Sequence, residues 1–216
     1  MKIFRRALYG LLVVCLLALF AALFGRMYIQ EYYPKDSLRI VFTDSLTDHY
    51  NATEDFKVYT QKIRAPYDDN KNACFFAKGL YLIPDAQTVQ VTMRYNDQML
   101  DAVAAKYKLE SLEPKEGLFR YTLTVSYNQD EDGTDFRTYD AVYSKESSAF
   151  LYHYNKLVFE GVDFENAAWM RVDVYLVGEE EAYGAVTVYE ANFEYNGELF
   201  PYEMKEEKIA KRDLPK

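Results

Sequence analysis

The chain carries one long uncharged stretch near its start, Ala7-Leu-Tyr-Gly-Leu-Leu-Val-Val-Cys-Leu-Leu-Ala-Leu-Phe-Ala-Ala-Leu-Phe-Gly25. At a rise of about 1.5 Å per residue, a helix over this stretch is roughly 28 Å long, which matches the hydrocarbon thickness of a bilayer. We therefore predict a single transmembrane helix over residues 7–25. Everything that follows it in the chain must then lie on one side of the membrane.

A cleaved signal peptide is the main alternative, because it shares the basic start at Lys2, Arg5 and Arg6 and the apolar run behind it. A cleavage site needs small residues at two recognition positions, and every cut within residues 18–25 places Leu or Phe in at least one of them. Lipoprotein attachment at Cys15 is disfavoured because a bulky valine precedes it and the apolar run continues past it. The sequence therefore favours an uncleaved signal anchor.

The basic residues predict the orientation of this anchor. Three of them precede the apolar stretch, whereas only Arg26 follows it closely. The positive-inside rule then places residues 1–6 in the cytoplasm and the rest of the chain outside it, as a single-pass protein of the cell membrane. Six residues are too few to fold, so any signalling across the membrane would need other membrane proteins.

The composition of the outer part limits the classes of partner. Residues 27–216 hold 21 Lys and Arg against 34 Asp and Glu, a net charge of about −13. This charge argues against binding of nucleic acid, which relies on basic side chains that neutralise phosphates, and against lying flat on anionic lipid. The length of 190 residues suits one domain with a sizeable core or at most two small domains. The 21 Tyr and 14 Phe residues of the chain favour strands over helices.

The two cysteines cannot form a disulfide within one chain, since Cys15 lies in the predicted span and Cys74 lies in the outer part. The outer domain must therefore be stable through its core alone. We expect Cys74 to be a small buried residue rather than a reactive thiol. Between the span and the domain, residues 26–36 are expected to form a juxtamembrane linker. Tyr28, Tyr32 and Tyr33 fit an interfacial aromatic belt there, and Pro34 is expected to end the helix.

Two segments alternate strictly between apolar and polar residues, Thr88–Tyr95 and 119–127, and both are predicted as half-buried strands. Between them, Asn96 or Asp97 is placed to cap a helix. The apolar positions of that helix recur with helical spacing at Leu100, Val103, Ala104 and Tyr107. The other predicted elements are strands at 37–43, 56–64, 136–143, 150–159, 170–177 and 185–195, a loop at 44–55, a turn-rich connection at 65–72 and a charged tail at 205–216. The strand at 150–159 is expected to be buried on both faces, and the strands at 170–177 and 185–195 are expected to be neighbours.

Two dipeptides predict hairpin turns. Asp132-Gly133 separates the strands 119–127 and 136–143, and Asn196-Gly197 joins the strand at 185–195 to a returning piece at 198–202. Pro201 marks that piece as an edge. The carboxylates Asp130, Asp132 and Asp135 of the first turn raise the possibility of a calcium site, but their spacing does not match an EF-hand loop, so a turn with solvated acids is favoured.

These elements predict a mainly β protein. Eight or nine short antiparallel strands with one short helix favour a β-sandwich or a jelly-roll-like domain over residues 37–204, preceded by the single transmembrane helix. No internal repeat and no low-complexity linker divides the domain.

The search for catalytic chemistry leaves few candidates. His49 and His153 are the only histidines, so a three-His metal centre is excluded, and no zinc motif, phosphate loop or nucleophile elbow occurs. His153 with a Ser and an Asp could form a triad in space, although a structural strand histidine is favoured. We therefore predict no catalytic, cofactor-binding or metal-binding residue and no cofactor, and we cannot assign ligand-binding residues.

The sequence favours a membrane-tethered domain that binds a protein partner or belongs to a membrane assembly, rather than an enzyme. The alternative is a module that binds a glycan or the cell wall, in which Trp169, the one Trp of the chain, would stack on a sugar. Packing of Trp169 in the core is the simpler interpretation. A hydrolase is a distant third function.

Overall fold

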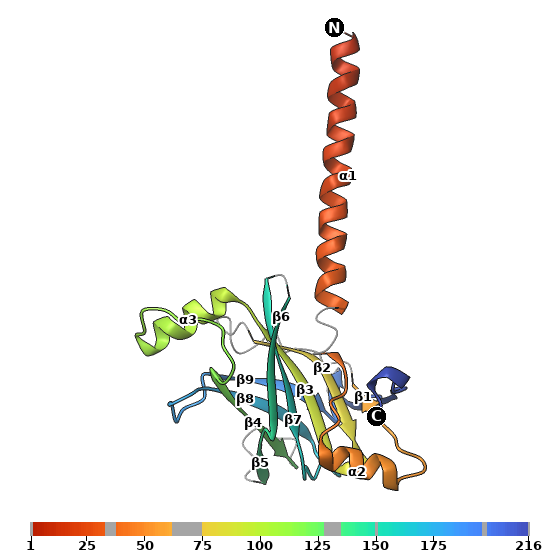
Figure 1. Ribbon diagram of the computed structural model, residues 1–216, viewed down its shortest axis with the longest axis vertical. Coiled ribbons are helices and arrows are strands. Elements are labelled where there is room, and N and C mark those ends of the chain that lie inside the picture. The colour runs from red at the N-terminus through yellow and green to blue at the C-terminus, as the bar shows by residue number, and fades with distance from the viewer. Residues whose placement is uncertain are drawn as a thin grey trace.

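The computed structural model describes residues 2–32, 38–61, 75–127, 135–149, 151–195 and 198–215. This part of the chain is mainly β, with two antiparallel sheets, a two-stranded ribbon, few helices and one long apolar helix at the amino end (Figure 1). The predicted mainly β class with an N-terminal apolar helix is therefore confirmed. The described residues contain twelve strands, more than the eight or nine predicted.

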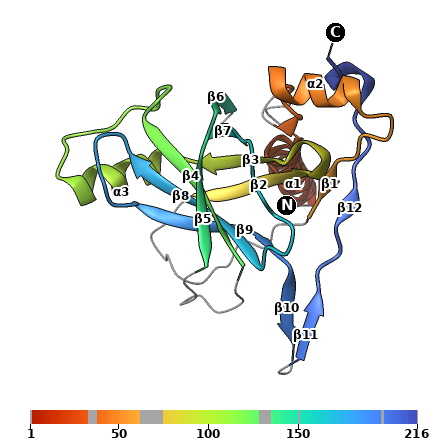
Figure 2. The same ribbon diagram turned by 90° about the horizontal axis from the view of Figure 1, so that it is seen from below.

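The larger sheet has six strands in the order β12-β1-β2-β3-β7-β6, and the smaller sheet has four in the order β5-β4-β8-β9. All neighbouring strands run antiparallel. The six-stranded sheet consists of β1 (Tyr59–Thr60), β2 (Phe76–Ile83), β3 (Thr88–Tyr95), β6 (Tyr143–Ala149), β7 (Tyr152–Phe159) and β12 (Lys205–Glu206). The four-stranded sheet consists of β4 (Phe119–Ser126), β5 (Phe136–Asp140), β8 (Trp169–Leu176) and β9 (Gly184–Glu190). The ribbon of β10 (Asn192–Tyr195) and β11 (Glu198–Pro201) extends away from both sheets (Figure 2).

The two sheets share one hydrophobic core, to which each contributes alternate residues of its strands. Val91 and Met93 of β3, Leu123 of β4 and Val172 of β8 are all fully buried in it. Burial of each such side chain contributes roughly 2 kcal/mol to the free energy of unfolding. Because successive side chains of a strand point to opposite faces, every second residue of these strands enters the shared core, as the alternation in sequence predicts.

Helix α1 (Lys2–Tyr32) has 31 residues and stands clear of the sheets (Figure 1). Its section Leu8–Tyr28 is long and apolar enough to span a membrane, and the apolar side chains there are exposed in the isolated chain. The predicted apolar helix is therefore confirmed, and it continues beyond the predicted end at residue 25.

Helix α3 (Asp97–Tyr107) has the predicted cap, since the Asn96 side chain accepts a hydrogen bond from the Met99 N–H at 3.1 Å. Met99, Leu100, Val103 and Ala104 are its buried residues. The helical spacing of apolar residues therefore identified the buried face correctly, apart from Tyr107, which is only half-buried.

Residues 38–55 do not form the predicted strand and loop. Residues 40–43 are extended without belonging to a sheet, because the Gln90 carboxamide bonds both the N–H and the C=O of Val41 in place of a neighbouring strand. Residues 44–52 form helix α2 (Asp44–Ala52), which Thr43 caps by accepting a hydrogen bond from Leu46 N–H. Leu46 is fully buried in a second, smaller core and is the one buried residue of α2. A contact with residues distant in the chain therefore stabilises this helix. A single apolar residue forms no helical period, so the sequence pattern did not predict it. This second helix in the domain corrects the prediction of one.

Strand β4 is buried on both faces rather than half-buried, with only Arg120 exposed, and the same is true of strand β3. Its outward residues Thr88, Gln90 and Thr92 are inaccessible to solvent, and only Arg94 is partly exposed. Residues 38–43, which are bonded through Val41, lie over this outer face. Gln90 bonds the covering segment and Thr88 donates to the Ala86 carbonyl, so these polar side chains of β3 bond to protein groups rather than to water.

Three predicted strands differ in extent. The 136–143 segment divides between β5 and β6, which belong to different sheets, and β6 was not predicted as a separate strand. The 185–195 segment divides between β9 and β10, and only Tyr59–Thr60 of the 56–64 segment forms a described strand, β1. Residues 62–64, the connection at 65–72 and Phe150 lie outside the described residues. Within β7, every residue from 154 to 159 is buried, which confirms burial on both faces.

The predicted charged tail contacts the domain. Residues 205–206 form β12, which pairs with β1, so that Tyr59 lies opposite Glu206. Ile209 packs on the second core, and Asp213 in the 3₁₀ turn Lys211–Asp213 forms an ion pair with Arg39 at 3.3 Å. The prediction of a free charged tail was wrong. A short edge strand such as β12 is held by backbone hydrogen bonds, which do not require alternating apolar residues, so the sequence shows no strand pattern there.

Both predicted hairpins are present, since β4 pairs with β5 and β10 pairs with β11. The turn residues 128–134 and 196–197 lie outside the described part. Strands β8 and β9 are neighbours, as predicted, with a register shift between Met170 and Arg171.

Candidate functional site

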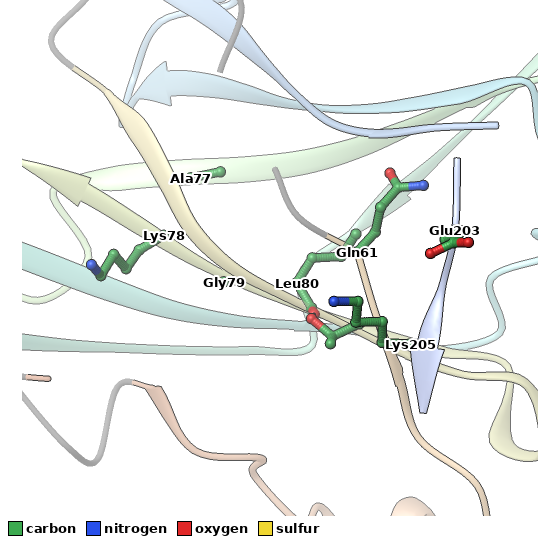
Figure 3. A pocket seen from close by; sticks show the side chains of 8 residues that line it. Gln61, Ala77, Lys78, Gly79, Leu80, Glu203 and Lys205 are labelled. Atoms are coloured by element: carbon green, nitrogen blue, oxygen red, sulfur yellow. The ribbon is translucent and has the colours of Figure 1, made fainter. Parts of the chain in front are cut away.

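A pocket of about 330 Å³ lies at the edge of the six-stranded sheet, beside β1 and the start of β12 (Figure 3). A register shift between Ala77 and Gly79 opens β2 at this point. A Cβ on Gly79 would meet no atom within 4 Å, so the absence of a side chain there leaves open space. The lining residues are Thr60, Gln61, Ala77, Lys78, Gly79, Leu80, Glu203 and Lys205.

Two polar side chains of this pocket, Gln61 and Thr60, are bonded within the fold. The Gln61 carboxamide bonds both backbone groups of Glu190 on β9, at 2.9 and 3.2 Å, and so ties the two sheets together. The Thr60 hydroxyl donates to the Leu80 carbonyl at 2.8 Å. The described lining holds no His, Cys or Ser, and its charged groups are two lysines and one glutamate. The lining therefore offers a small polar recess whose ionisable groups are limited to Lys78, Glu203 and Lys205.

A second polar cluster surrounds His153, the histidine weighed as a triad member. Its Nδ1 lies 2.9 Å from Ser148 Oγ, and its Nε2 lies 2.9 Å from Asp97 Oδ1. Glu146 accepts a hydrogen bond from Tyr95, whose ring packs on the imidazole with centroids 5.2 Å apart. The structure thus brings a Ser, a His and an Asp together from β6, β7 and the first residue of α3.

The cluster lacks the surroundings that make such a triad catalytic. A triad Asp is buried, so that it orients the His and stabilises the imidazolium, whereas 79% of the Asp97 side chain is exposed. Ser148 is also exposed, and the pocket described above is lined by none of the three residues. The hydrogen bonds instead hold the amino end of α3 against the six-stranded sheet, which favours a structural role.

Lys156 on β7 is the one buried lysine among the described residues, with 2% of its surface exposed. Its Nζ has no hydrogen-bond partner among them and lies 4.9 Å from the centroid of the Tyr81 ring. Burial lowers the pKa of Lys156 to about 7, because the charged form loses its hydration. Tyr81 donates to the carbonyl of Leu38, so this lysine lies beneath the segment that enters the domain from α1.

Six exposed glutamates gather at one end of the domain, here named the acidic end. The connection from α3 to β4 and the connection from β8 to β9 lie side by side there in both views (Figures 1 and 2). Tyr107 donates to the carbonyl of Glu181, and Lys106 donates to that of Tyr183, both at 3.4 Å. The six residues are Glu110, Glu113 and Glu116 of the first connection and Glu179, Glu180 and Glu181 of the second.

The acidic end combines charge with exposed apolar surface. Leu109 and Val177 belong to the same two connections and are 43% and 59% exposed. Burial and the nearby carboxylates of Glu179 and Glu181 raise the pKa of Tyr107, which is consistent with a negative potential there. Three lysines of the α3 side, Lys106, Lys108 and Lys115, offset half of the glutamate charge. The run of glutamates at 179–181 was visible in the sequence, but its proximity to residues 110–116 was not.

Trp169 is partly buried at the start of β8, where Arg171 lies over its ring at 5.5 Å from the centroid. Its Nε1 is buried without a hydrogen-bond partner among the described residues. One face of the ring is therefore covered by a cation, and Trp169 is neither a fully buried core residue nor an open platform.

The structure describes only some of the remaining residues that the sequence raised as site candidates. Asp135 is exposed, while Asp130, Asp132 and Cys74 lie outside the described residues. Cys15 is exposed on α1. Within the described ranges, no group of three or more His, Cys, Asp and Glu side chains is arranged to hold a metal ion.

Comparisons with protein-family models, with curated proteins and with solved structures found no match to this chain.

Proposed function

We propose that this protein is a single-pass membrane protein whose β-rich domain lies outside the cytoplasm. The length and apolar composition of Leu8–Tyr28 support the span, and the basic residues before it support a cytoplasmic position for residues 1–6. The two sheets, which share one core, are interpreted as the layers of an antiparallel β-sandwich.

The domain acts by binding a protein partner through the acidic end. The observation that carries this proposal is that six exposed glutamates and two exposed apolar side chains, Leu109 and Val177, lie on the same two adjoining connections. In protein interfaces, apolar residues at the centre lose water on binding, while charged residues at the rim set orientation and partner choice. The acidic end has this composition.

The partner should present a basic surface. The outer chain carries a net charge of about −13, which attracts a basic protein over distances near the Debye length, about 8 Å at physiological salt. Complementary charge mainly raises the association rate, and the gain falls as salt screens it. Binding through the acidic end should therefore weaken as the salt concentration rises.

Glycan or cell-wall binding is the second candidate function, and Trp169 is the residue that would serve it. For a sugar to stack on the face that Arg171 covers, this arginine would have to move away. Such stacking depends little on salt. A hydrolase using Ser148, His153 and Asp97 is the third candidate, and the exposure of Asp97 and Ser148 weighs against it.

The experiment is affinity capture with the full chain in detergent, cross-linked at low and high salt. One variant carries Glu179→Gln, Glu180→Gln and Glu181→Gln, which removes three charges from the acidic end. The matched control removes three exposed acids near α2, with Asp48→Asn, Glu54→Gln and Asp55→Asn. Each triple variant raises the net charge equally, so a difference between them reports position and not total charge.

The proposal predicts a partner that wild type and the α2 control retain at low salt, and that high salt or the acidic-end variant removes. Equal loss in both triple variants would mean that only the overall charge matters. Binding to purified cell wall that is insensitive to salt and is lost in Trp169→Ala would support the glycan candidate instead.

A further inference from the structure

Aromatic and apolar side chains gather around Arg94 at one end of the six-stranded sheet. Leu151, in the turn between β6 and β7, is 53% exposed, and Phe76 at the start of β2 is 39% exposed. The Arg94 guanidinium lies 4.6 Å from the centroid of the Tyr152 ring and 5.2 Å from that of Phe76. These four residues, Phe76, Arg94, Leu151 and Tyr152, are here named the aromatic tip.

The register of the sheet explains why residues from three strands meet there. Phe76 lies opposite Arg94 in the pairing of β2 with β3, and Arg94 lies opposite Tyr154 in the pairing of β3 with β7. The β6–β7 turn closes immediately beyond Tyr152, whose partner on β6 is Ala149. The aromatic tip is therefore held by the sheet and not by a long loop.

The aromatic tip lies on the side of the domain from which α1 rises. In Figure 1 the adjoining ends of β6 and β7 point the same way as α1 and reach the level of its lower end. Five residues, 33–37, separate the described end of α1 from Leu38, so this connection spans at most about 20 Å. Leu38 is itself bonded to Tyr81 on the same sheet, so the sheet stays close to the end of α1.

The length of α1 sets the position of the bilayer surface. Leu8–Tyr28 is about 31 Å long, enough for the hydrocarbon core, and the four residues to Tyr32 add about 6 Å, similar to the headgroup layer. The domain therefore begins directly below the headgroups. Aromatic rings and arginine side chains with apolar stems are typical of that layer, where one part of the side chain is dry and the other wet.

We infer that the aromatic tip contacts the headgroup layer of the bilayer that α1 spans, so that the domain is held against the membrane at two points. This inference rests on the anchoring by α1 that is part of the proposed function. The acidic charge of the whole domain opposes contact with anionic lipid, but Arg94 places a cation at the tip itself. A second contact also limits the rotation of the domain about its short connection, and so fixes the direction in which the acidic end faces.

The experiment places a single Trp at chosen positions of the full chain, in a Trp169→Phe background, in phosphatidylcholine vesicles. In two sets of vesicles about half of the lipid carries bromine: near the glycerol end of its acyl chains, which quenches Trp fluorescence at the bilayer surface, or near the methyl end, which quenches a Trp in the middle of α1. Leu151→Trp and Phe76→Trp report the aromatic tip from two strands. Phe20→Trp reports insertion of α1, and Val177→Trp, at the acidic end, is the exposed control.

Trp at positions 151 and 76 should lose about half of its emission in brominated vesicles and shift to shorter wavelength, as expected for a side chain in the interface. Position 20 should also be quenched, and position 177 should not. Quenching at 20 without quenching at 151 and 76 would overturn the second contact and leave the anchor intact. No quenching at 20 would overturn the anchor itself, and quenching at 177 equal to that at 151 would mean that the domain has no preferred face toward the membrane.

Discussion

Replacement of Lys156 by Met should remove a dependence of stability on pH that this buried lysine introduces. In the folded protein the pKa of Lys156 is lowered to about 7 by burial, from 10.5 for an ordinary lysine. Between these two pH values the unfolded chain binds a proton that the folded protein does not bind. The free energy of unfolding of wild type therefore rises with pH through this window, and it falls again as pH drops toward 7.

The magnitude follows from the two pKa values. One pKa unit corresponds to about 1.4 kcal/mol, so burial of the charged Lys156 costs about 5 kcal/mol at pH 6 relative to a neutral group. At pH 9 the folded lysine is neutral, and the loss of its proton still costs about 2 kcal/mol. Lys156→Met has no such cost at either pH. The stability advantage of the variant over wild type should therefore shrink by about 3 kcal/mol from pH 6 to pH 9. Differences in packing between Lys and Met shift the advantage equally at both values and leave this change intact.

The assay is urea unfolding of the full chain in detergent, followed by the fluorescence of the single Trp, Trp169, at half-unit steps from pH 6 to pH 9. The upper limit avoids the tyrosines Tyr95, Tyr121 and Tyr127, whose pKa values burial raises above 10 and whose ionisation destabilises the fold at higher pH. Lys145→Met is the matched control, because Lys145 lies opposite Lys156 on β6 but is exposed. It should keep the slope of wild type. A constant difference between Lys156→Met and wild type over the whole range would refute a lowered pKa for Lys156.

Two further predictions test the fold and the topology. Asn96→Ala should lower the free energy of unfolding by about 1 kcal/mol, because it removes the hydrogen bond that caps α3, whereas Asn96→Asp should keep most of it; equal losses in urea unfolding would contradict a capping role. In intact cells, protease added outside should remove the domain while α1 stays in the membrane fraction, and full protection of the domain would show that the orientation is wrong.

Local sequence patterns were sufficient to predict those structural elements that depend on residues close in the chain. The cap of α3 and its buried face follow from Asn96 and from apolar residues three and four apart. The hairpin of β10 and β11 follows from the Asn196-Gly197 pair between two short β-forming runs. The uncharged stretch near the amino end likewise predicts a long helix, because its backbone hydrogen bonds are all made within a few residues.

Contacts between distant residues decided the rest. Strand β12 pairs with β1 through backbone groups, and Leu46 stabilises α2 only by entering a core formed with residues such as Ile83. The outer face of β3 is buried because Gln90 bonds Val41, although its polar alternation is typical of a solvent face. In each case the stabilising free energy comes from contacts between two segments that are distant in the chain. No short stretch of sequence contains both segments, so no local pattern predicts the contact.

The features of the candidate sites fall into the same two groups, those that follow from the sequence and those that need the tertiary structure. Sequence alone determined the acidic charge, the small set of histidines and the long apolar stretch near the amino end, because these depend only on which residues are present. Only the tertiary structure placed Ser148 and Asp97 at His153, covered Lys156, and brought the glutamates at 110–116 beside those at 179–181. Charge, burial and hydrogen bonding act over a few ångströms in space, and the fold alone sets which residues come within that range.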